Sequence, residues 1–92
     1  MSDLNKVLYN LNRYLGSNVK LYASSRANKK FMIQRPDTGK WVHFGDSRYE
    51  DYTRHLDIER RFRYLNRANA IRGNWRNDPY SANNLAINLL WS

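Results

Sequence analysis

The apolar residues near the start of the chain recur three or four positions apart, which is the spacing of one face of an α-helix. These positions are Leu4, Val7, Leu8, Leu11, Tyr14 and Leu15. Ser2 is a suitable N-cap, Asp3 complements the positive end of the helix dipole, and Gly16 stands where a left-handed C-terminal cap is common. The pattern predicts a helix over residues 2–15.

Three short segments then alternate apolar and polar residues, as half-buried β-strands do. They cover residues 18–23, 29–35 and 40–44. Residues 36–39, with the sequence Pro-Asp-Thr-Gly, favour a hairpin turn, because proline presets one backbone angle and glycine accepts a positive φ. Three strands make the smallest sheet expected to be stable, and we expect the first helix to cover its apolar face.

The second half of the chain predicts two helices after an irregular segment. Residues 45–55 are polar and aromatic without a period, and we expect a structured loop there. Asp57 is suited to cap a helix that runs to about Arg72 and ends at Gly73. We expect that helix to be buried through Ile58, Phe62 and Leu65. Ser81 is a suitable cap for a last short helix that turns inward Leu85, Leu89 and Trp91.

These elements predict an α+β fold with an N-terminal helix, a small three-stranded antiparallel sheet and two C-terminal helices. The 92 residues, of which 41% are hydrophobic, suit one small basic domain over residues 1–92. The chain contains no cysteine, and because small secreted domains commonly depend on disulfides, this favours an intracellular or intraviral setting.

The sequence shows neither a signal peptide nor a membrane span. The first residues lack a basic region followed by an apolar run, and the longest apolar stretch, residues 85–91, is far shorter than the ~20 residues that crossing requires. We therefore expect no membrane partner.

The net charge of the chain indicates more about its binding partners than its hydrophobic content does. Sixteen Lys and Arg residues against eight Asp and Glu give a net charge of +8. Residues 54–76 carry much of it, with seven arginines and two acidic residues. On a helix, Arg60, Arg63 and Arg67 fall within about 60° of one another, opposite the apolar residues. We call these three residues the arginine stripe.

The arginine stripe is suited to a polyanion. Its members are about one helical turn apart, roughly 5–6 Å, which is comparable to the ~7 Å between successive phosphates of one strand. The pattern predicts sequence-independent binding of nucleic-acid phosphates, or of acidic protein surfaces, and a merely solvated helix face stays open as the alternative. The predicted binding residues are Arg54, Arg60, Arg63, Arg67, Arg72, Arg76 and Trp75.

The aromatic residues around these arginines have two interpretations. They can stack on bases or on a partner, or they can belong to the core, which is their more common role in a small domain. They are Tyr49, Tyr52, Tyr64, Trp75 and Tyr80.

Candidate catalytic residues are few. The spacing of Asp51 and His55 suits a carboxylate beside an imidazole, as general base catalysis requires, but the same spacing suits hydrogen bonds that tie a loop to the following helix. Metal-ligand spacing, a glycine-rich phosphate loop and a nucleophile elbow are all missing from the sequence. We expect no enzymatic activity, no catalytic residue, no cofactor, no metal and no small-molecule substrate.

Residues 44–91 resemble an uncharacterised family of small basic proteins of large eukaryotic DNA viruses, the nucleocytoplasmic large DNA viruses. The matching residues are Phe44, Gly45, Tyr49, Asp51, Tyr52, Thr53, His55, Asp57, Glu59, Arg60, Tyr64, Leu65, Arg67, Trp75, Asp78, Pro79, Ala82, Leu89, Leu90 and Trp91. The chain departs from the family pattern at Ala68, Gly73, Asn83 and Asn84.

The resemblance implies a viral source and a place in the virion, with the host cytoplasm or nucleus as the site of assembly. It implies no activity. We expect a virion structural protein that contacts genomic DNA or neighbouring virion subunits, and the alternative is a minor capsid protein that cements capsid subunits without nucleic acid. Within the matched half, we expect Tyr52, His55 and Trp75 to tie the loop to the last helix.

Overall fold

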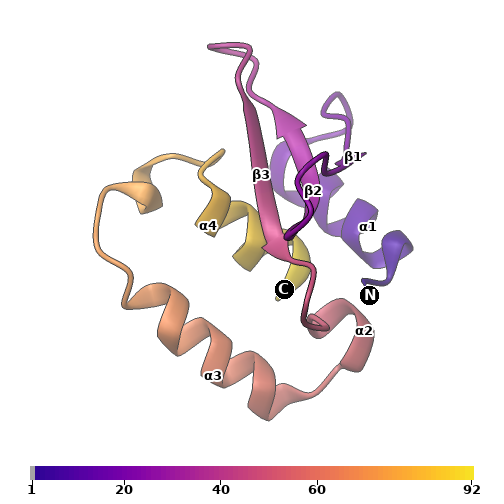
Figure 1. Cartoon of the computed structure of the whole chain (residues 1–92), viewed down its shortest axis with the longest axis vertical. Helices are drawn as coiled ribbons and strands as arrows, with labels where there is room; N and C mark the ends of the chain where they lie inside the picture. The colour runs from indigo at the N-terminus through magenta and orange to yellow at the C-terminus, as the bar shows by residue number, and fades with distance from the viewer. Residues whose placement is uncertain (1) are drawn as a thin grey trace.

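The structure, a computed structural model, describes residues 2–92 as a three-stranded sheet with helices packed on it and a further helix standing to one side (Figure 1). The predicted α+β fold is confirmed. The elements in chain order are α1 (Leu4–Leu15), β1 (Tyr22–Ala23), β2 (Lys29–Gln34), β3 (Trp41–Asp46), α2 (Tyr52–His55), α3 (Ile58–Asn69), the 3₁₀ turn η1 (Trp75–Asn77), α4 (Ala82–Leu85) and the π-helical turn η2 (Ala86–Leu90).

The sheet has the order β1-β2-β3, and both pairs of neighbouring strands are antiparallel. The predicted hairpin turn is confirmed. The Arg35 amide donates to the Lys40 carbonyl at 2.8 Å, and Gly39, with φ +73°, donates to the Arg35 carbonyl at 2.9 Å. Strand lengths differ from the prediction at both ends of the sheet. Only residues 22–23 of the first segment pair, whereas β3 continues to Asp46 because that residue pairs with Lys29.

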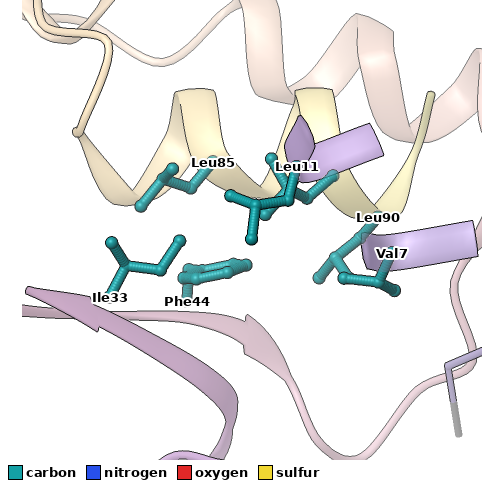
Figure 2. Close-up of a cluster of buried hydrophobic side chains, with 7 residues drawn as sticks. Val7, Leu11, Ile33, Phe44, Leu85 and Leu90 are labelled. Atoms are coloured by element: carbon teal, nitrogen blue, oxygen red, sulfur yellow. The ribbon is translucent and has the colours of Figure 1, made fainter. Parts of the chain in front are cut away.

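The hydrophobic core lies where α1 and the α4–η2 segment meet one face of the sheet (Figure 2). Each large apolar side chain that is fully buried there contributes about 1.5–3 kcal/mol. The predicted inward orientation of Leu85 and Leu89 is confirmed. The buried cluster consists of Val7, Leu11, Ile33, Phe44, Leu85, Leu89 and Leu90.

The first helix is shorter and less apolar on its inner face than the pattern predicts. Asp3, and not Ser2, is its N-cap, because the Ser2 hydroxyl instead donates to the carboxylate of Asp51. Leu4 and Leu8 are 54% and 44% exposed. Asn10 is buried in their place, and its amide donates to the Leu89 carbonyl at 3.0 Å, which satisfies the polar group.

The segment predicted as a loop contains a helical turn. Residues 45–46 complete β3, and α2 then forms behind an N-cap at Asp51, whose carboxylate accepts from the Thr53 amide at 3.1 Å. The predicted caps at Asp57 and Ser81 are confirmed, since each accepts a backbone amide of the helix that follows it.

The orientation predicted for α3 was wrong for two of its three apolar residues, since only Leu65 is half-buried. Ile58 and Phe62 are 64% and 66% exposed, and the helix ends at Asn69 rather than near Arg72. The helix is amphipathic, but it stands apart from the sheet, and its inner side is held by Tyr64 and Ala68 (Figure 1). An apolar pattern identifies one face of a helix and does not determine which face meets the rest of the chain.

Candidate nucleic-acid interface

A cleft of about 610 Å³ separates α3 from the end of the sheet and the C-terminal segment. Its walls come from four parts of the chain that are distant in sequence. The lining residues are Lys29, Lys30, Phe44, Gly45, Asp46, Tyr49, Glu50, Asp51, Arg60, Arg63, Tyr64, Arg67, Ala82, Asn83, Ala86, Leu90 and Trp91. We call this hollow the cleft.

The arginine stripe lines the cleft along α3. The structure places Arg60, Arg63 and Arg67 on one side of the helix, as the sequence predicts, and that side faces the sheet and the C-terminal segment. Arg60 is half-buried, whereas Arg63 and Arg67 are exposed. The face of α3 that the sequence predicts to be exposed to solvent therefore forms a wall of the cleft and not part of the convex outer surface.

The acidic residues of the cleft are each paired with a cation. Asp51 accepts from Lys30 at 2.8 Å, and Asp46 from Arg48 at 2.9 Å. Glu50 lies 3.8 Å from Arg54. Arg48 also lowers the pKa of Asp46 to about 2, so this carboxylate stays charged and paired.

Four cations of the cleft have no such partner. Within residues 2–92, no carboxylate lies at salt-bridge distance from Lys29 or from any member of the arginine stripe. Clustered cations repel one another, and a surface on which cations outnumber acidic residues attracts anions. The cleft thus holds an uncompensated positive charge that an anion can neutralise.

The floor of the cleft is organised around Asp51, which is 1% exposed. Besides Lys30 and the Thr53 amide, the hydroxyls of Ser2 and Thr53 also donate to this carboxylate. These contacts join the start of the chain, β2 and α2 at one buried point. They hold the floor of the cleft in place.

Among residues 2–92, the side chains of Asp51 and His55 are hydrogen-bonded to other groups and not to each other. The Asp51 carboxylate accepts the hydrogen bonds described above, and Nδ1 of His55 accepts a hydrogen bond from the Asp57 amide at 2.9 Å. Burial and the nearby Arg60 lower the pKa of His55, which favours the neutral imidazole. The hydrogen bonds tie α2 to the start of α3, in agreement with the structural interpretation of this spacing.

An aromatic wall closes the cleft at its C-terminal end. Tyr64 and Trp91 are stacked with ring centroids 4.2 Å apart and planes within 4°. His55 packs on Trp91 at 5.3 Å and on Tyr52 at 6.2 Å. The Arg61 guanidinium donates to the Trp91 carbonyl at 2.7 Å. His55 thus joins α2 to Trp91, directly after the last helical turn, whereas Tyr52 reaches Trp91 only through its contact with His55.

The remaining predicted binding residues lie outside the cleft. Arg54 is exposed beside Glu50, and Arg72 is exposed beyond the end of α3. Arg76 stacks on Trp75 with 4.4 Å from its guanidinium to the ring centroid, and the Trp75 indole donates to the Ile71 carbonyl at 2.8 Å. Trp75 therefore orders the chain after α3. Its carbonyl also accepts from the Ser81 hydroxyl at 2.9 Å and from the Asn84 side-chain amide at 2.8 Å, which ties it to the start of α4.

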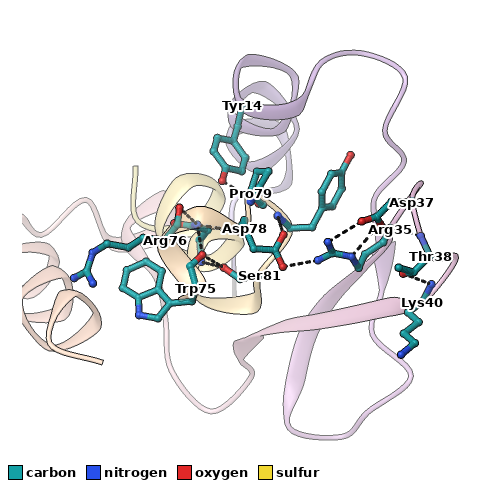
Figure 3. A network of polar contacts seen from close by, with 12 residues as sticks. Tyr14, Arg35, Asp37, Thr38, Lys40, Trp75, Arg76, Asp78, Pro79 and Ser81 are labelled. Carbon is teal, nitrogen blue, oxygen red and sulfur yellow. Dashed lines mark hydrogen bonds and ion pairs between the residues drawn. The ribbon is translucent and has the colours of Figure 1, made fainter. Parts of the chain in front are cut away.

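A polar network fixes the connection that follows (Figure 3). Arg35 donates to Asp78 at 2.7 Å and pairs with Asp37 at 3.0 Å, which lowers the pKa of both carboxyl groups. The Tyr14 hydroxyl donates to the Pro79 carbonyl at 2.9 Å. The β2–β3 hairpin and α1 thus hold the start of α4, and with it the far wall of the cleft.

Sequence reasoning missed the contribution of β2 and of the segment after β3. The sequence pattern predicts Lys29 and Lys30 only as strand residues, and Tyr49 only as one of several aromatic residues. Gly45 is a signal for this junction, because glycine tolerates a positive φ. Its φ is +82°, and a Cβ there would lie 2.7 Å from the Leu90 side chain. Glycine at this position allows the sheet and η2 to meet at the cleft.

Fold and cleft together define a small α+β protein with a cationic hollow between a helix and a sheet. The chain belongs to DUF5754, a family of unknown function, whose match covers residues 19–68. That range contains the sheet, α2 and nearly all of α3, and therefore every cationic residue of the cleft. No curated protein and no solved structure matches the chain.

Two further observations concern residues 2–92. None of the helices there combines the length and apolar character needed to cross a membrane. The described histidine, aspartate and glutamate residues form no group of three or more that could hold a metal ion.

Proposed function

We propose that this protein binds nucleic-acid phosphates without reading sequence and acts as a structural component rather than as an enzyme. The observation that carries the proposal is the convergence of Lys29 and the arginine stripe on one cleft, with no acidic partner for any of the four among residues 2–92. Arginine supports this function because its planar guanidinium binds phosphate through two parallel hydrogen bonds.

The arrangement of these cations also favours a chain of phosphates over a single small anion. Arg60, Arg63 and Arg67 are spaced along α3 at roughly one turn, which follows the spacing of phosphates along a strand. Phosphate contacts of this kind position a protein on nucleic acid and carry no sequence information. The expected binding is therefore moderate in affinity and sensitive to salt.

A charge-matched pair of variants tests the proposal. The variant Arg60→Ala, Arg63→Ala and Arg67→Ala removes three cations from the cleft. A control triple removes three exposed cations elsewhere, by Arg13→Ala, Arg26→Ala and Lys40→Ala. We expect the first triple to lose at least about tenfold in affinity for a fluorescent oligonucleotide at 50 mM salt, and the control to lose much less. Equal losses, or no loss in the cleft triple, would contradict the proposal.

We further propose that this binding takes place in a virion, on genomic DNA. The support is the resemblance of residues 44–91 to small basic proteins of large DNA viruses. Fractionation of purified virions tests the setting. The protein should remain with the genome-containing core when the outer shell is removed, and its absence from virions, or release with the shell, would contradict it.

The second candidate is a minor capsid protein that cements subunits. It is favoured by one observation, the apolar outer face of α3 and its neighbour Leu56, where Leu56, Ile58 and Phe62 are 54%, 64% and 66% exposed. Exposed apolar residues gathered on one side are common at protein interfaces. A wild-type protein that binds no nucleic acid, together with a Phe62→Ser variant that is no longer incorporated into virions, would favour this candidate over the first.

A further inference from the structure

We propose that the cleft takes a single strand of nucleic acid, with one unstacked base against its aromatic residues, and does not take a duplex. This inference rests on the proposed function, since it names the form of nucleic acid that the same cations would bind. It follows from where the cations point and from the aromatic residues that accompany them.

The cations face inward. The arginine stripe lines the cleft together with residues of the sheet and of the α4–η2 segment, and Arg60 is half-buried. A helix reads duplex DNA by entering the major groove, which is about 12 Å wide, with its contact face outward. The contact face of α3 is opposed by the rest of the protein, so α3 cannot enter a major groove with that face outward. A flexible single strand can enter the hollow.

The size of the cleft is consistent with such an occupant. Its volume of about 610 Å³ falls within the ~300–1,000 Å³ of clefts that enclose drug-sized ligands, and a nucleotide belongs to that size class. Lys29 at one side and Arg67 at the other place positive charge on both walls. A phosphate between them meets cations from two elements.

Aromatic residues accompany the cations on both sides of the cleft. Tyr49 lies at its edge, 61% exposed, and Tyr64 and Trp91 form its end wall. Single-strand binding proteins combine a cationic groove with aromatic rings on which bases stack, and this stacking tolerates any sequence because every base has a π-face. Oligoglutamate and polyphosphate carry no ring that could stack on these aromatic side chains.

Tyr49 also has a close counterpart elsewhere in the chain. Arg48 lies 5.7 Å over the Tyr49 ring, and Arg13 lies 5.6 Å over the ring of Tyr9, which is 63% exposed on α1 and outside the cleft. The two tyrosines match in exposure and in their cationic neighbour. Tyr9→Leu is therefore a fitting control for Tyr49→Leu.

The test compares four 12-residue ligands of known charge by fluorescence anisotropy at 50 mM salt. They are a labelled oligothymidylate, a duplex of the same length, an abasic strand with the same phosphates, and oligoglutamate. We expect the oligothymidylate to bind at least about tenfold more tightly than the duplex or the abasic strand. Tyr49→Leu should weaken binding of the oligothymidylate by about fivefold or more and leave the abasic strand unaffected, and Tyr9→Leu should change neither.

The outcomes separate this inference from the function on which it rests. Binding of the duplex as tight as that of the oligothymidylate overturns the single-strand inference, and equally tight binding of the abasic strand overturns the base contact. Both results leave phosphate binding in place. A Tyr49→Leu variant that behaves as Tyr9→Leu does also overturns the base contact. If no nucleic acid binds, or if oligoglutamate binds as tightly as the oligothymidylate, the proposed function itself is overturned.

Discussion

The buried ion pair between Asp51 and Lys30 provides the sharpest test of how the cleft is held together. The side chains of Asp51 and Lys30 are only 2% and 10% exposed, and their charged atoms lie 2.8 Å apart. Replacing Asp51 with Asn keeps the shape and a capping oxygen for α2 but removes the charge. Lys30 is then left as a buried cation without a counter-charge.

The expected loss follows from this geometry. Breaking a buried pair by removing one partner costs about 3–5 kcal/mol, because the remaining charge is poorly solvated. Asp51→Ala should cost about 1 kcal/mol more than Asp51→Asn, since it also removes the N-cap of α2. With an m value of ~1.5 kcal/mol/M, the urea midpoint of Asp51→Asn should fall by roughly 2–3 M.

Urea denaturation followed by tryptophan fluorescence measures the loss, and a second variant identifies its cause. Lys30→Met removes the buried cation, so the double variant with Asp51→Asn should recover at least about 2 kcal/mol relative to Asp51→Asn alone. A loss below about 1 kcal/mol in Asp51→Asn, or strictly additive effects in the double variant, would refute the reasoning.

Three other predictions concern the packing and the pH response. Gly45→Ala should destabilise the fold by about 1–3 kcal/mol more than Gly39→Ala in urea titrations. Both glycines have a positive φ, but only a Cβ at position 45 would collide with the Leu90 side chain. Equal losses in the two variants would contradict this prediction. Phe62→Ala should change the free energy of unfolding by less than about 0.5 kcal/mol, whereas a buried phenylalanine would lose about 3–5 kcal/mol. Because burial lowers the pKa of His55, the unfolded chain binds the proton more readily, and stability should fall as the pH drops below about 6.5. His55→Gln should flatten that part of the pH profile, and an unchanged slope would count against the assignment.

Much of the fold could be predicted because its signals are local. The hairpin turn depends on a proline and a glycine that are four positions or fewer apart, and the caps Asp57 and Ser81 act on amides two or three residues away. Such contacts are visible in the order of the residues. They account for the confirmed number and direction of the strands and for the start of α3.

The burial of α3 could not be predicted for the opposite reason. Its spacing of Ile58 and Phe62 indicates an apolar face, but the partner of the inner face is Trp91, nearly thirty residues further along the chain. The ion pair of Asp51 with Lys30 likewise joins residues that are 21 positions apart in the sequence. Contacts of this range depend on how complete elements pack, and no local pattern encodes them.

The candidate site likewise combines residues that a local pattern predicts with residues that only the folded chain brings together. The arginine stripe could be located because helical periodicity alone brings its members together. Lys29 and Tyr49 could not be joined to it, since they reach the cleft only through the pairing of β2 with β3 and the turn after β3.

The salt dependence of oligonucleotide binding tests the central claim most directly. Four phosphate contacts, from Lys29 and the arginine stripe, predict a slope of log affinity against log salt of about −3 for a single strand, or a loss of about 50-fold between 50 and 200 mM salt. The triple alanine variant of the stripe should show a slope near about −1. An affinity that does not change with salt, or a variant with the slope of the wild type, would contradict the account.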